Sequence, residues 1–233
     1  PYGQLLKISV EAMLTQLYLS EQLRMEQNAN ELYVHDIING NFEDTNVFLT
    51  KGEVLGYDLS LPRLALNIKV NNLVIKEKSK GLYDNQELTA QEKREKILDC
   101  IKKVFDNPQN MISHNGSNYY IVFFAPQKIH VKTVKQQIKE IADKLSKKLE
   151  KYSVKFCIGV GSYYPGLAGL RKSYKEAVKA IQIVERKSPG QLPQIIFAQD
   201  LSLEMMLAAA PDDIVGIFKN QVLTKESAEV FLN

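Results

Sequence analysis

Residues 114–124, HNGSNYYIVFF, decide how the middle of this chain is interpreted. Asn115 and Gly116 follow a short apolar segment and precede the continuous apolar run at 119–124. An Asn-Gly pair between two strand candidates is the strongest short-range hairpin signal, because both residues tolerate positive φ. We therefore predict a β-hairpin over 111–124, with Asn115 and Gly116 in a type I′ turn.

Segments on both sides of this hairpin change repeatedly between strand-like and helix-like periods. Apolar residues at every second position predict strands at 63–70, which we expect to be half buried, and at 154–160. A short apolar run at 195–197 predicts a last strand. Helical periodicity predicts further helices at 89–107, where Thr89 opens a capping box, at 131–145 and at 167–184.

The order of these elements predicts the fold. A helix pair is followed by β-α-β-β-α-β, by one more helix and strand, and by a helical tail from Leu201 that Pro211 restarts. The middle part is the split βαβ arrangement, which forms an antiparallel sheet with helices on one face. We predict an α+β fold with a palm-like or ferredoxin-like sheet, flanked by N-terminal and C-terminal helices.

The first forty residues have the pattern of one long helix. Its apolar stripe is formed by Leu5, Leu6, Val10, Met13, Leu14, Leu17 and Leu23. This stripe could pack on the domain or on a second copy of the chain, and the pattern does not separate the two. The helix should break at 39–41, and a second short helix should end at Gly56, which adopts a left-handed cap easily.

Composition describes a cytoplasmic, soluble globular protein. Of 233 residues, 45% are hydrophobic and 24% are charged, and there is no membrane-spanning apolar run or signal peptide. The chain lacks an initiator Met, so we expect it to continue on both sides in the natural protein. Cys100 and Cys157 are expected to be reduced and structural. The net charge of +3 is small, and we expect it to be spread over the surface.

Three stretches together resemble a known family: LGYDLSLPRLALNI at 55–68, NGSNYYIVFF at 115–124 and IGVGSYYPGLAGLRKSYKEAVKAI at 158–181. They are similar to the central region of bacterial sugar-diacid (carbohydrate diacid) transcriptional regulators, of the wider purine-catabolism-regulator type. The third stretch is the most specific. Because that central region is a degenerate relative of the diguanylate cyclase domain, the resemblance implies a sheet of the diguanylate-cyclase type.

The same resemblance implies an organisation for the chain. Residues 1–58 would be the end of a sensing domain and a helical linker, 59–200 the degenerate cyclase-like domain, and 201–233 a helical segment before a helix-turn-helix. It implies a homodimer that contacts DNA through that helix-turn-helix. It also implies that an upstream domain binds a sugar-acid inducer. The helix-turn-helix and the upstream domain are both absent from this chain. No residue of the chain itself is then expected to bind DNA, and no membrane is involved.

A diguanylate cyclase carries Gly-Gly-Asp/Glu-Glu-Phe on this hairpin, and its acids help hold divalent cations. In this sequence those positions are Asn115, Gly116, Ser117, Asn118 and Tyr119, so one glycine and an aromatic remain and both acids are neutral. Residues 61–75 contain no Asp or Glu, and Lys69 and Asn71 stand where first-strand acids are expected. Because Mg²⁺ needs anionic oxygen ligands, we predict no metal, no cofactor and no catalytic residue.

Other sites are less favoured. His35, His114 and His130 have no metal-ligand spacing, and His114 beside the turn is either a pocket residue or an ordinary loop histidine. The spacing Gly159-x-Gly161 is not that of a dinucleotide loop, and a strand end is favoured. We predict a non-enzymatic module of a transcriptional regulator. The alternatives are a nucleotide-binding sensor derived from a cyclase, a weak cyclase or a structural spacer.

Overall fold

The computed structural model describes residues 2–71, 83–128, 130–152 and 154–207. Within these ranges no helix is long and apolar enough to cross a membrane. The elements are α1 (Tyr2–Asn39), α2 (Thr45–Val54), β1 (Leu64–Asn71), α3 (Tyr83–Val104), β2 (Met111–Asn115), β3 (Tyr119–Phe124), α4 (Val131–Leu149), β4 (Lys155–Val160), α5 (Gly166–Lys187), β5 (Ile195–Phe197) and α6 (Ser202–Leu207). Short 3₁₀ helices follow α4 (Glu150–Tyr152) and β5 (Ala198–Leu201).

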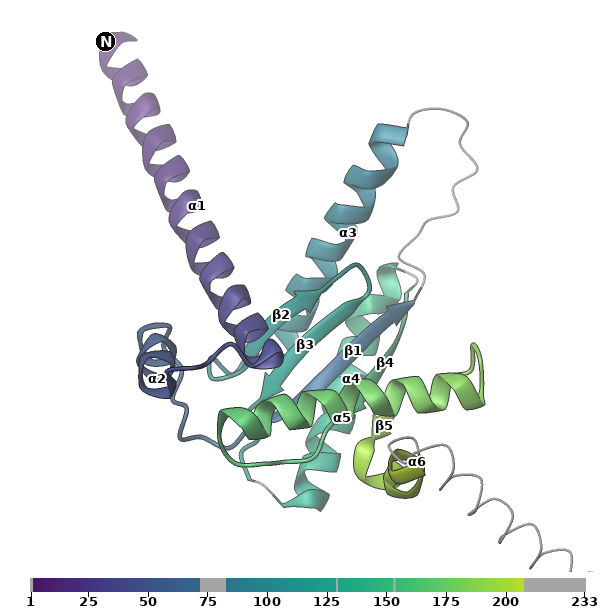
Figure 1. Ribbon diagram of the computed structural model, residues 1–233. Coiled ribbons are helices and arrows are strands. Elements are labelled where there is room, and N and C mark those ends of the chain that lie inside the picture. Colours follow the sequence, from purple (N-terminus) through teal and green to yellow (C-terminus); the bar gives the residue numbers. More distant parts are fainter. Residues whose placement is uncertain (1, 72–82, 129, 153, 208–233) are drawn as a thin grey trace, which may run out of the picture.

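The strands form a five-stranded sheet in the order β2-β3-β1-β4-β5 (Figure 1). All neighbouring pairs are antiparallel except β4 and β5, which are parallel. The α+β fold and the βαββαβ core that the sequence predicts are therefore confirmed. The parallel fifth strand follows α5, which returns the chain to the far edge of the sheet.

Helices cover both faces of the sheet, so the prediction of helices on one face only is wrong. One face packs on α3 and α4, and the other packs on α2, α5 and the last turns of α1 (Figure 1). The central strand β1 is accordingly buried on both sides, not half buried, and Asn67 is only 1% exposed. Its alternating small and polar side chains resemble a solvated face, but they lie beneath α5.

Close approach of α5 to the sheet explains the Gly159-x-Gly161 pattern. A Cβ on Gly161 would lie 2.0 Å from the Ser173 carbonyl oxygen, and one on Gly159 would lie 2.3 Å from the Ala177 carbonyl oxygen. The Ala65 amide donates to the Ser173 hydroxyl at 2.8 Å, which joins α5 to β1 directly. The two glycines are therefore places where a helix backbone touches a strand, and the favoured interpretation as a strand end is confirmed.

The hairpin forms, but its turn differs from the one predicted. Asn115 is paired with Tyr119, so three residues, 116–118, connect the strands, and Asn115 is not inside a type I′ turn. Gly116 has φ of +67°, the left-handed conformation expected for this glycine. Asn115 stays in the strand, where its side-chain amide donates to the Tyr174 hydroxyl at 2.9 Å.

Helix boundaries follow the sequence in most places. The breaks after Asn39 and before Gly56 are confirmed, and Asp44 caps α2 by accepting from the amides of Asn46 and Val47. Helix α3 begins at Tyr83, so the start predicted at Thr89 is wrong. The ambiguous segment at 72–82 and the tail beyond 207, with Pro211, lie outside the described residues.

Only the last turns of α1 are packed on the sheet. Tyr33, Val34 and Ile37 are fully buried, whereas the helix before them extends away from the domain (Figure 1). Of the predicted stripe, Val10, Met13, Leu14 and Leu17 are each more than half exposed, while the side chains of Leu5, Leu6 and Leu23 lie outside the described part. The stripe is therefore not covered by the described part of the domain.

Candidate functional site at the central hairpin

The hairpin tip lies beside β1, and cross-strand pairing brings three predicted positions into one row. Asn115 on β2 pairs with Tyr119 on β3, which in turn pairs with Lys69 on β1. The next member of the row, on β4, is Cys157. The register therefore places Lys69 of the first strand beside the hairpin positions.

Lys69 is held in an ion pair at this row. Its side chain is 14% exposed, its Nζ lies 2.5 Å from Glu185 Oε1 of α5, and it sits 5.7 Å from the centre of the Tyr119 ring. Burial alone would lower the pKa of Lys69. Hydrogen bonds with Glu185 and Tyr119, together with their charges, outweigh burial and raise the pKa above its ordinary value. An ammonium group therefore occupies this side of the hairpin.

A second contact ties the hairpin to α5. The Asn115 amide donates to the Tyr174 hydroxyl, and burial raises the pKa of Tyr174, although that hydrogen bond opposes the rise. The turn itself is joined to β1, because the Val70 amide donates to the Asn118 carbonyl at 2.8 Å. Gly116, by contrast, has open space where a Cβ would be, so its φ alone requires glycine.

The other side of the hairpin is tied to α1. His35 Nε2 lies 3.0 Å from the His114 carbonyl oxygen, and His114 Nδ1 lies 3.4 Å from Glu31 Oε1. Glu31 and His35 are four residues apart, so they share one face of α1. His114 has features of both interpretations that were left open. Its side chain is half exposed, as in an ordinary loop, and it also lines a cleft.

This cleft, of about 290 Å³, lies between α1, α3 and the hairpin. It is lined by Gln27, Glu31, Gln91, Arg94, Glu95, Leu98, His114, Gly116 and Tyr120. The Tyr120 hydroxyl donates to the Arg94 carbonyl at 3.2 Å, and burial raises the pKa of Tyr120 to about 12. The lining mixes both signs of charge. Across the ranges that the structure describes, no three His, Cys, Asp or Glu residues gather closely enough to hold a metal ion.

Comparison with known families identifies the domain. The family model described as a GGDEF-like domain matches residues 39–183. The chain belongs to the GGDEF-like domain family. A solved structure of an EAL/GGDEF domain protein from M. capsulatus is similar, with 12% sequence identity and a TM-score of 0.42; the match covers 64% of this chain and 92% of that one. Comparison with curated proteins finds no match.

The hairpin of this GGDEF-like domain offers a defined set of groups. Its own side chains are amides, a hydroxyl and a phenol, and the neighbouring ionisable pairs are Lys69 with Glu185 on one side and His114 with Glu31 on the other. Sequence reasoning missed Glu185 and Glu31, because each lies far from the hairpin in sequence. The helical period of α5 indicated that Tyr174 faces the sheet, but nothing in the sequence indicated that its hydroxyl would accept a hydrogen bond from Asn115.

Proposed function

We propose that this GGDEF-like domain is the non-catalytic central module of a bacterial DNA-binding transcriptional regulator of the sugar-diacid type. It would couple a sugar-acid sensor upstream to a helix-turn-helix downstream, through dimerisation, with the boundaries 1–58, 59–200 and 201–233 given above. The observation that carries the non-catalytic part is the Lys69–Glu185 ion pair beside a hairpin with no acid. The resemblance of the three sequence stretches supports the regulator part.

The ion pair argues against cyclase chemistry on electrostatic grounds. Phosphoryl transfer of this kind depends on divalent cations that bridge the phosphate oxygens and are held by carboxylates. Here Lys69 places a positive charge next to the hairpin, and Glu185 is already neutralised by it. A cation would meet repulsion from Lys69 and only neutral ligands at 115–119.

The exposed part of α1 supports dimerisation. A helix of 38 residues is about 57 Å long, and only its last turns are buried in the domain. Large apolar side chains are rarely left exposed in such numbers unless a partner covers them. We propose that the partner is α1 of a second copy, because a symmetric dimer suits two DNA half-sites.

The end of α1 is fastened to α5, which provides a route from the sensor to the domain. Arg171 Nε donates to the Ile38 carbonyl at 3.2 Å. Its guanidinium also packs closely on Gly40, where an added Cβ would lie 2.7 Å from the nearest guanidinium nitrogen. A cation at the carboxyl end of a helix is also favoured by the helix dipole. A change in the pairing of two α1 helices would therefore act on α5 and on the hairpin together.

Two measurements on this chain test the proposal. Incubation with GTP and Mg²⁺ should produce no cyclic dinucleotide, and light scattering should report a dimer. Detectable turnover, or a monomer at high concentration, would contradict the corresponding part. The parent gene should encode a helix-turn-helix after Asn233, and a stop codon there would contradict the regulator assignment.

A thermal melt with GTP and Mg²⁺ distinguishes the nucleotide-binding sensor from the proposed module. A ligand present at about one hundred times its dissociation constant adds roughly 2.7 kcal/mol of stability to the folded state. We expect no shift in melting temperature. A shift without turnover, abolished by Gly116→Trp, would instead favour a nucleotide-binding sensor.

A further inference from the structure

Two helices carry the excess positive charge of the chain: α4 and α5 each have six cations and two carboxylates. Helix α5 carries six cations, Arg171, Lys172, Lys175, Lys179, Arg186 and Lys187, and two carboxylates, Glu176 and Glu185. Each helix thus has a net charge of +4, while the whole chain has +3, so the remaining residues together carry −5. The two helices differ in where their carboxylates lie, because Glu140 and Asp143 of α4 are exposed among its lysines.

Both carboxylates of α5 are turned to internal partners. Glu176 accepts from the Ser162 amide at 3.0 Å and from the Tyr164 hydroxyl at 2.6 Å, and Glu185 is paired with Lys69. Neither carboxylate therefore neutralises the outward face of the helix. This face is left to the cations and to uncharged residues.

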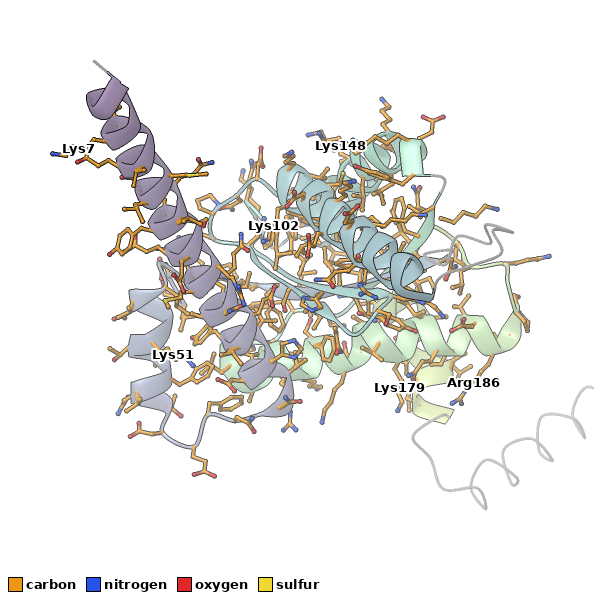
Figure 2. All side chains as sticks on the ribbon, turned by 90° about the horizontal axis from the view of Figure 1, so that it is seen from above. Lys7, Lys51, Lys102, Lys148, Lys179 and Arg186 are labelled. Atoms are coloured by element: carbon orange, nitrogen blue, oxygen red, sulfur yellow. The ribbon has the colours of Figure 1, made fainter. Side chains whose placement is uncertain are left out.

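Four cations form a row on that outward face, which we name the basic stripe: Lys172, Lys175, Lys179 and Arg186. The spacing of 3, 4 and 7 residues keeps them on one side of the helix over about 21 Å. In the part of the chain that the structure describes, no carboxylate pairs with Lys175, Lys179 or Arg186. Figure 2 shows Lys179 and Arg186 pointing away from the sheet, with Lys148 of α4 on the opposite side of the molecule.

Although the family resemblance predicts no DNA-binding residue in this chain, we propose that the basic stripe binds the phosphate backbone of double-stranded DNA. Backbone contacts need only a linear array of cations and no base contacts. A protein partner would need apolar or aromatic anchors at the centre of its interface, and the exposed positions of α5 other than its cations are Gly166, Ala168 and Gln182. A membrane-lying helix would need a free apolar face, but that face of α5 is buried on the sheet.

The choice of DNA as the polyanion rests on the proposed function, which places this domain next to a DNA duplex. The stripe would add non-specific affinity to the specific contacts of the helix-turn-helix. It would also orient the domain along the duplex, because the four cations lie in one line. The charge layout itself does not depend on whether the domain has lost cyclase activity.

The test is binding of this chain to a fluorescently labelled 20-base-pair duplex, measured by anisotropy at several salt concentrations. With four phosphates neutralised, log K should fall with log salt at a slope of about −3.6. The double variant Lys175→Gln/Lys179→Gln should reduce this slope by about 2 and weaken binding at least roughly tenfold at low salt. The control Lys139→Gln/Lys148→Gln has the same change in net charge on exposed positions of α4, and it should bind within about twofold of the parent.

Several results would overturn the proposal. These are no binding at about 50 mM salt, equal loss in both double variants, and tighter binding to anionic phospholipid vesicles or to an RNA duplex than to DNA. Circular dichroism melts of both variants establish that they are folded. GTP turnover or a monomeric chain would contradict the proposed function but leave the slope measurement valid, so the two failures are distinguishable.

Discussion

Replacing Gly161 with alanine tests how closely α5 is seated on the sheet. The new Cβ would lie 2.0 Å from the Ser173 carbonyl oxygen and 2.6 Å from the Ser173 hydroxyl oxygen. Because the nearest obstacle is backbone, no side-chain rotation relieves the contact, and α5 or the end of β4 must move. Overpacking of a core costs about 1–3 kcal/mol, and occasionally more. We expect about 3 kcal/mol here, since Ser173 lies within α5 and Gly161 is held against β1 by its backbone hydrogen bond to the Ala65 carbonyl.

Thermal unfolding followed by circular dichroism measures this loss. In a protein of this size, about 3 kcal/mol corresponds to a fall in Tm of roughly 6–12 °C. Gly116→Ala is the matched control, because its Cβ meets nothing within 4 Å and only the φ of +67° opposes it. That conformation costs about 1 kcal/mol, or roughly 2–4 °C. If the Tm of Gly161→Ala falls no further than the Tm of Gly116→Ala, close packing does not explain Gly159 and Gly161.

Three further predictions follow from single contacts. A double-mutant cycle of Asn115→Ala and Tyr174→Phe in urea should give a coupling of about 1 kcal/mol, and strict additivity would contradict a shared hydrogen bond. Burial raises the pKa of the Cys157 thiol to about 12, so the unfolded thiol ionises first and stability should fall from about pH 9 upward. In Cys157→Ala the fall should begin nearer pH 10, where buried tyrosines take over, and identical pH profiles of unfolding would refute this. Arg171→Met removes the donor to the Ile38 carbonyl and should speed hydrogen exchange in the last turn of α1, whereas unchanged exchange would argue against that fastening.

The order of strands and helices could be predicted because each element has a clear apolar period. The period of β1 also shows why burial of its second face could not be predicted. Ala65, Asn67 and Lys69 alternate with large apolar residues as solvent-facing residues do, and only the approach of α5 buries them. Gly159 on β4 and Gly161 directly after it allow that approach, but glycine also occurs in turns, so the sequence alone supports either explanation.

The neutral character of the hairpin could be predicted from residue types alone, since serine and asparagine cannot replace carboxylates. Its fastening to two helices could not. Glu185 lies 116 residues from Lys69, and nothing in the local pattern of α5 distinguishes it from any other surface carboxylate. The predicted type I′ turn was wrong for a similar reason. The Asn-Gly signal is local in sequence, whereas Asn115 is held by the hydroxyl of Tyr174, which is distant in sequence.

The contacts between the hairpin and α1 depend on where α1 sits along its own axis. Glu31 lies opposite His114, and His35, one turn later, contacts the His114 carbonyl. A slide of α1 by about one turn, 5.4 Å, would bring His35 opposite His114 in place of Glu31. The Glu31 carboxylate would then be replaced by a second imidazole opposite His114. On the proposed coupling, the hairpin thus distinguishes two registers of α1 through the contacts of His114.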